Sequence, residues 1–198
     1  MPMIFTETEN NYILQLKHGS VEELHRGLWL AIIEVGEIPP HIALICEGLY
    51  YSVSVKKTDA GSSFASFLKA IGRRSKPSLF VKIKPTVSSS DKSIASFFEK
   101  YPPLNTVHEN ANEAPVTCLN PIRDFFANAY SEKYKRASFV FELLALAQQD
   151  GFIERCAGIY IEQKREIILP KYTHSEIREK INSLMMPVRE QAQPHSKG

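Results

Sequence analysis

Two residues in this sequence have the type and the surroundings that nucleophilic catalysis requires. Cys118 lies in the segment TCLNPIRDFF, and His41 opens the apolar stretch HIALICEGLYYSVSV. A thiolate attacks carbonyl carbon atoms, and an imidazole carries the proton that such a reaction moves near neutral pH. The two residues are far apart along the chain, so a site forms only if the fold brings them together.

Cys118 lies near the predicted start of a helix. Either Asn120 caps this helix with Pro121 in the first helical position, or Thr117 caps it and Cys118 begins it. In both cases the thiol lies near the positive end of the helix dipole, which lowers the pKa of a thiol and favours the thiolate. Cys118 is therefore the predicted nucleophile.

Residues 41–55 have the pattern of a β-hairpin. Glu47-Gly48 is the predicted turn, because glycine accepts the positive φ that two-residue hairpin loops need. This turn pairs Cys46 with Leu49 and so sets the register of the hairpin. One face is then large and apolar, whereas the other carries small residues and one imidazole.

The second face consists of His41, Ala43, Ser52 and Ser54, because side chains alternate along a strand. The register places His41 opposite Ser54 and Ala43 opposite Ser52. We expect a hydroxyl of Ser54 or Ser52 to bond one ring nitrogen and orient the imidazole, while Ala43 leaves room for a helix N-terminus. The predicted site thus has a nucleophile, Cys118, a general base, His41, and a serine that orients the base.

The segments PPHIALICEGLYYSVSV and TCLNPIRDFF resemble the circularly permuted papain-like proteins of the NlpC kind, relatives of the lecithin:retinol acyltransferase fold. The resemblance covers roughly residues 38–131. It implies hydrolysis or transfer at an amide or ester carbonyl through an acyl-cysteine, with His41 as general base and Cys118 as nucleophile. This chain departs from the family pattern where Ser54 and Ser52 replace a carboxylate, amide or imidazole, and where Ala43 replaces a glycine.

The same residues also fit a protein without enzymatic activity. A histidine at the start of a strand is often structural, and a cysteine often packs as a small apolar residue, as we expect for Cys46 and Cys156. The small-residue face of the hairpin and the polar loop at 102–115 then form a groove for a partner. This alternative is a non-enzymatic α+β binding or interaction domain.

Composition narrows the classes of function. The 198 residues are 43% hydrophobic and 23% charged, with a formal net charge of +2, which disfavours nucleic acid as a partner. Three widely spaced cysteines form neither a disulfide framework nor a zinc pattern, so we expect free thiols in a reducing cytoplasm and no metal or cofactor. We expect no signal peptide and no integral membrane segment. The expected substrate is a small-molecule, peptide or lipid-derived amide or ester.

The remaining elements predict a single α+β domain over residues 1–186 and a disordered tail over 187–198. Its sheet is small and mainly antiparallel, with helices packed on one face, which resembles a permuted papain-like fold. Apolar periodicity and capping residues predict these elements. They are strands at 12–17 and 78–84, a hairpin over 157–169 turning at 164–165, and helices at 20–35, 63–72, about 91–100, 134–149 and 174–185.

Overall fold

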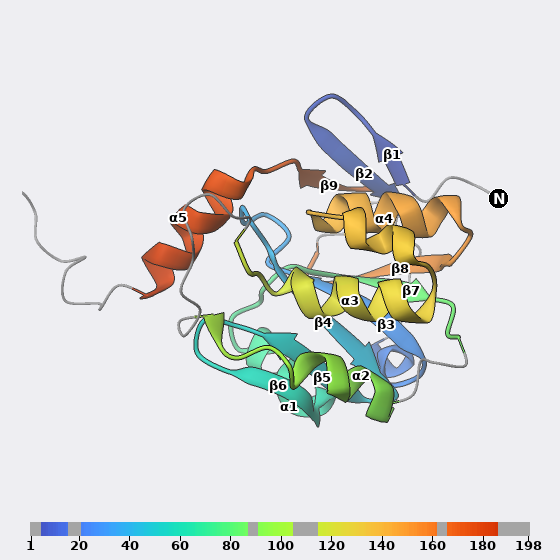
Figure 1. Ribbon diagram of the computed structural model, residues 1–198, viewed down its shortest axis with the longest axis vertical. Helices are drawn as coiled ribbons and strands as arrows, with labels where there is room; N and C mark the ends of the chain where they lie inside the picture. Colours follow the sequence, from blue (N-terminus) through green and yellow to red (C-terminus); the bar gives the residue numbers. More distant parts are fainter. Residues whose placement is uncertain (1–4, 16–20, 87–90, 105–114, 162–165, 186–198) are drawn as a thin grey trace, which may run out of the picture.

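The computed structural model describes residues 5–15, 21–86, 91–104, 115–161 and 166–185. The predicted tail at 187–198, the predicted turn at 164–165 and most of the loop at 102–115 lie outside these residues. The described residues form two antiparallel sheets with helices (Figure 1).

The larger sheet has six strands in the order β6-β5-β4-β3-β7-β8, and every neighbouring pair is antiparallel. The smaller sheet has the order β1-β2-β9 and is also antiparallel. The strands of the larger sheet are β3 (Leu28–Ile33), β4 (His41–Cys46), β5 (Leu49–Val53), β6 (Thr58–Ser63), β7 (Ser78–Ile83) and β8 (Ile153–Ile159). Those of the smaller sheet are β1 (Phe5–Glu7), β2 (Asn11–Gln15) and β9 (Glu166–Pro170).

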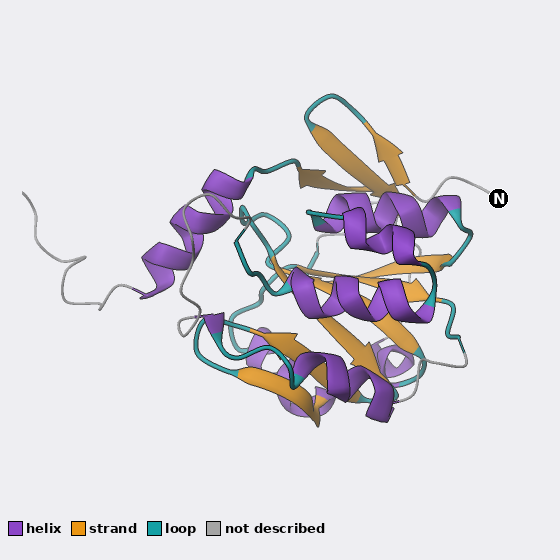
Figure 2. Cartoon of the chain, in the orientation of Figure 1, coloured by secondary structure: helices purple, strands orange, loops and turns teal. Residues whose placement is uncertain are grey.

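Helices cover both faces of the larger sheet (Figure 2). Helices α2 (Asp91–Phe98), α3 (Leu119–Ala129) and α4 (Val140–Gln149) pack on one face, which we call the α3 face, and α1 (Phe64–Gly72) packs on the other, the α1 face. The predicted mainly antiparallel α+β class is confirmed, but the sheet is covered by helices on two faces rather than one.

The shorter helical elements lie around these layers. The two 3₁₀ helices are η1 (Val21–His25) and η3 (Glu132–Arg136), and the last described helix is α5 (His174–Met185). Helix α5 lies to one side of the layers, beyond the N-terminal end of α3 (Figure 1).

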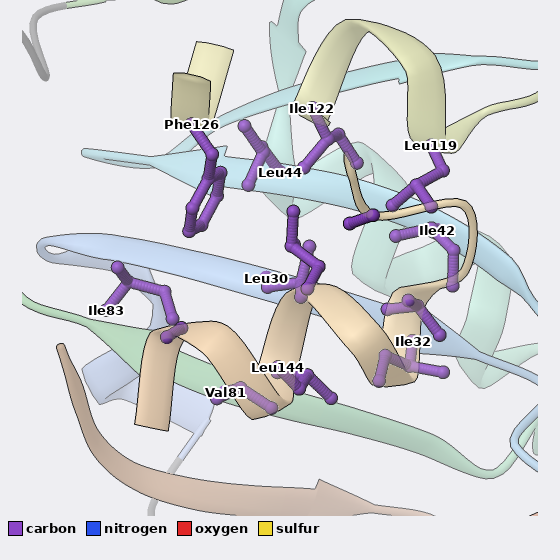
Figure 3. Close-up of a cluster of buried hydrophobic side chains, with 14 of the residues drawn as sticks. Leu30, Ile32, Ile42, Leu44, Val81, Ile83, Leu119, Ile122, Phe126 and Leu144 are labelled. Atoms are coloured by element: carbon purple, nitrogen blue, oxygen red, sulfur yellow. The ribbon is translucent and has the colours of Figure 1, made fainter. Parts of the chain in front are cut away.

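The core of the α3 face fixes α3 against β4. Ile42 and Leu44 of β4 point toward Leu119 and Ile122 of α3, and all four are buried (Figure 3). Burying one such side chain contributes roughly 1.5–3 kcal/mol. The apolar residues that follow Cys118 therefore hold the start of α3 over the start of β4.

The prediction of a helix from Ser20 to Val35 is wrong. Ser20 lies outside the described residues, and the segment after it forms η1 and then strand β3. All six residues of β3 are buried, so both of its faces are apolar and the alternation that marks a half-buried strand is absent. Without that alternation, the apolar residues of this segment also fit the spacing of an amphipathic helix.

Two further predictions about elements are wrong in part. The helix predicted at 134–149 begins only at Val140. The Glu142 carboxylate accepts from the backbone N–H groups of Ser138 and Phe139 and so caps the N-terminus of the helix at this point. The hairpin predicted over 157–169 does not form, since β8 pairs with β7 and β9 with β2. The helices at α1, α2 and α5 and strand β7 agree with prediction.

The hairpin of β4 and β5 has the predicted register over part of its length. Cys46 pairs with Leu49, and both Glu47 and Gly48 have positive φ in the turn. The ladder ends at the pair Leu44–Tyr51, however, so the predicted pairs farther along the strands are not part of it. The β3–β4 ladder continues to His41, so β4 stays with β3 where it leaves β5.

Candidate functional site

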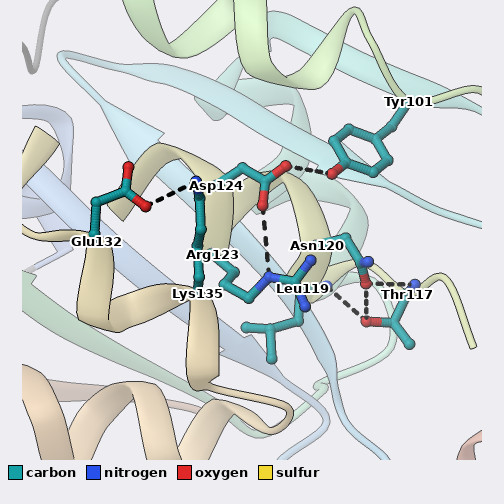
Figure 4. Close-up of polar contacts among 8 residues, drawn as sticks. All are labelled: Tyr101, Thr117, Leu119, Asn120, Arg123, Asp124, Glu132 and Lys135. Carbon is teal, nitrogen blue, oxygen red and sulfur yellow. Dashed lines mark hydrogen bonds and ion pairs between the residues drawn. The ribbon is translucent and has the colours of Figure 1, made fainter. Parts of the chain in front are cut away.

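A local network fixes the start of α3 and with it the position of Cys118. Asn120 Oδ1 accepts from the Thr117 backbone N–H at 2.9 Å and from its hydroxyl at 3.0 Å, and Thr117 Oγ1 accepts from the Leu119 N–H at 3.1 Å (Figure 4). The helix begins at Leu119, with Cys118 as the N-cap residue and Pro121 in the first turn. Of the two predicted helix starts, the one with Thr117 as the capping side chain is the closer.

The sulfur of Cys118 lies against the opened end of the β4–β5 hairpin. The Ile42 backbone N–H donates to Cys118 Sγ at 3.4 Å, within the range of a hydrogen bond to sulfur. This amide lies beyond the last β4–β5 pair, so the thiol takes the place of a carbonyl acceptor on the neighbouring strand. Ile42 follows His41 directly, so Cys118 lies at the strand end that carries His41, with the side chains of Ile42 and His41 on opposite faces of the sheet.

His41 is held by a group that the sequence analysis missed. Its Nε2 lies 3.3 Å from the hydroxyl of Tyr50, which in turn is hydrogen-bonded to the buried Ser52. Tyr50 is itself fixed, because its ring stacks on Phe67 of α1 with centroids 4.3 Å apart. The signal for Tyr50 was present in the register, since it shares a strand face with His41 and Ser52.

Neither of the two serines predicted to orient the imidazole has a hydrogen bond to the ring among the contacts of the described residues. The Ser54 hydroxyl donates to the Lys57 carbonyl at 2.8 Å and accepts from the Lys57 N–H at 3.1 Å, so it closes the turn between β5 and β6. Ser52 acts on the ring only through Tyr50. The strands diverge beyond Leu44, which is why Ser54 does not face His41 across a ladder.

The site is neutral at rest. Burial raises the pKa of the Cys118 thiol to about 11, and the Ile42 hydrogen bond offsets this only in part. Burial also lowers the pKa of His41 to about 4. The expected lowering of the thiol pKa by the helix start is therefore wrong, because the loss of solvation outweighs it.

The site borders a large cavity. His41, Cys118 and Ser54 are among the residues lining a cavity of about 1090 Å³, which also reaches α1 and α5. Cys118 is half-buried, whereas Cys46 and Cys156 are buried, and all three are free thiols. A ligand in this cavity can reach the thiol of Cys118 but not the other two.

The pKa shifts of two tyrosines show which side chains lie near Cys118. Burial raises the pKa of both Tyr50 and Tyr172, and the charge of Cys118 adds to the increase in each case. The sulfur is thus close to a tyrosine that touches His41 and to a tyrosine that precedes α5.

Among the residues that the structure describes, no helix combines the length and the apolar character needed to cross a bilayer. Comparisons with protein-family models, with curated proteins and with solved structures found no match for this chain.

Proposed function

We propose that this protein is a cysteine-dependent hydrolase or acyltransferase that acts on an amide or ester carbonyl. The observation that carries the proposal is the hydrogen bond from the Ile42 amide to Cys118 Sγ, which brings the thiol to the residue next to His41 at the wall of one cavity. The resemblance to permuted papain-like proteins supports the same assignment. The free thiols fit a reducing compartment such as the cytoplasm.

The reaction starts from a neutral thiol and a neutral imidazole. As Cys118 Sγ bonds to the carbonyl carbon, its proton passes to His41, which then gives it to the departing nitrogen or oxygen. The bond to that leaving atom breaks, and an acyl-cysteine remains. Water or a second acceptor, deprotonated by His41, attacks the acyl carbon and releases the thiol.

Tyr50 sets the tautomer that this reaction needs. A ring whose Nε2–H donates to the Tyr50 hydroxyl keeps Nδ1 free to accept a proton, and the hydrogen bond between Tyr50 and Ser52 holds that hydroxyl in place. Tyr50 is therefore the proposed positioning residue, in the place that the sequence analysis gave to Ser54.

Thiol alkylation tests this function without a known substrate. Iodoacetamide should label Cys118 much faster than Cys46 or Cys156, and His41→Ala should slow the labelling of Cys118 near pH 7. Because imidazole assists only when neutral, the rate should stay high at neutral pH and fall as pH approaches about 4. Equal labelling of the three cysteines would contradict the proposal.

One observation favours the second candidate, a domain that binds a ligand in the same cavity without turning it over. A thiol with a pKa of about 11 and no help from a base is almost wholly protonated at neutral pH. In that case Cys118 labelling should be slow at pH 7, should rise until pH nears 11, and should not depend on His41. The pH profile therefore separates the two functions.

A further inference from the structure

The cavity has two chemically different ends. We propose that it takes amides in which an apolar acyl group is joined to a leaving part that carries a carboxylate. This inference rests on the proposed function for the bond that is broken, whereas the shape of the ligand follows from the cavity alone.

The apolar end is formed by α5 and by Tyr172, which precedes this helix. Ile177, Ile181 and Leu184 recur at spacings of four and three, so they lie along one side of the helix, and all three line the cavity with Tyr172. Ile177 and Tyr172 are buried, whereas Leu184 is 54% exposed at the far end. This row of apolar side chains can cover an extended hydrocarbon chain.

The other end carries positive charge that no residue in the described part of the chain neutralises. Arg73 and Arg74, exposed at the end of α1, line the cavity and form no ion pair with any described residue. Lys56 also lines the cavity, is exposed, and forms no ion pair with any described residue. The other three lysines of the lining differ in this respect. They are paired as Lys76–Glu34, Lys180–Glu37 and Lys57–Asp59. A guanidinium fork matches a carboxylate in geometry and charge.

The elements that lie near each site residue assign the two halves of the substrate. Helix α1 packs on the same sheet face as Tyr50, which holds His41, so the arginines lie on the side of the proton donor. The group that leaves takes its proton from His41, whereas the acyl group stays on the sulfur. The carboxylate therefore belongs to the leaving part, and the apolar chain to the acyl part that lies along α5.

Binding to the full-length Cys118→Ala variant tests this assignment without turnover. The probes for calorimetric titration are N-dodecanoylglycine, its neutral analogue N-dodecanoylglycinamide, and N-acetylglycine, which lacks the chain. We expect N-dodecanoylglycine to bind best, the neutral analogue to bind about tenfold more weakly, and N-acetylglycine not to bind measurably.

Variants of each end give the second arm. Arg73→Gln with Arg74→Gln should weaken N-dodecanoylglycine about tenfold and leave the neutral analogue unchanged, and Ile181→Ser with Leu184→Ser should weaken both. Lys69→Gln is the control, because Lys69 is exposed on α1 but does not line the cavity. Equal affinity for the two long-chain probes, or arginine variants that bind like the control, would overturn the assignment.

The two proposals fail separately. If N-dodecanoylglycine binds as expected but Cys118 labelling shows no dependence on His41, the ligand class stands and the catalytic function falls. If labelling depends on His41 but none of the probes binds, the catalytic function stands and the ligand class is wrong.

Discussion

The sulfur of Cys118 accepts a hydrogen bond at 3.4 Å from the backbone amide of Ile42. It does so because β4 leaves β5 after the pair Leu44–Tyr51 and the start of α3 comes to lie beside the freed strand end. The contact links two segments that are distant in sequence, and Ile42 is the residue that directly follows His41.

Removing the Tyr50 hydroxyl should impair the base without removing it. In Tyr50→Phe the stacking on Phe67 is kept, but Nε2 loses its partner at 3.3 Å, so the imidazole is free to adopt the wrong tautomer. We expect the alkylation rate of Cys118 at pH 7 to fall about tenfold, which is less than the roughly 10²–10⁴-fold that acid–base assistance contributes, because the imidazole itself remains.

Tyr160→Phe is the matched control for this change, because Tyr160 is 51% exposed and does not line the cavity. A role for Tyr50 in packing alone would predict a loss of stability in Tyr50→Phe with an unchanged alkylation rate. Measuring the rate and the free energy of unfolding on the same samples distinguishes the two.

Burial of His41 should make the protein sensitive to acid. Its pKa is about 4 in the folded protein against an ordinary 6.5, so between these values the unfolded chain binds a proton that the folded one does not. Stability should therefore fall as pH decreases from 6.5 to 4, by up to about 2 kcal/mol at pH 5 from this residue.

Urea unfolding at pH 7 and pH 5 measures this effect. The loss of stability between the two pH values should be smaller in His41→Asn, which cannot titrate, than in the unmodified protein. An equal loss in both would mean that His41 is protonated in the folded state and cannot act as a base over this range.

The start of α3 should depend on Asn120. Asn120→Ala removes two hydrogen bonds to Thr117, at 2.9 and 3.0 Å, and should lower the free energy of unfolding by about 1–2 kcal/mol. It should also loosen Cys118, so that its alkylation no longer depends on His41. Asn128→Ala, at an exposed position of the same helix, should change neither quantity by more than about 0.5 kcal/mol or twofold.

Two local features around the candidate site could be predicted from the sequence. The turn at Glu47-Gly48 has a local chemical signature, and the Cys46–Leu49 pairing follows from it. The position of Cys118 at a helix start likewise follows from its neighbours, since Thr117 and Asn120 are capping residues. Local signals of this kind do not depend on the rest of the fold.

The features that were predicted wrongly depend on contacts between residues that are distant in sequence. Strand β3 is buried on both faces, and a helical spacing describes such a run equally well. Tyr50 is the partner of His41 because the strands separate before Ser54 can face it, and the turn sequence does not show where a hairpin ladder ends. The thiol pKa was wrong in direction because the extent of burial is a property of the whole fold.

The most direct test of the account is a cross-link between Cys118 and His41. 1,3-Dibromoacetone has two alkylating carbons joined by one carbonyl, so after reacting with Cys118 it bonds only a nucleophile within a few ångströms. Peptide mass spectrometry of the treated protein should show the Cys118 peptide joined to the His41 peptide, and His41→Asn should abolish the product. A Cys118 modified at one end only, with the native His41 present and free, would contradict the proposed pairing of nucleophile and base.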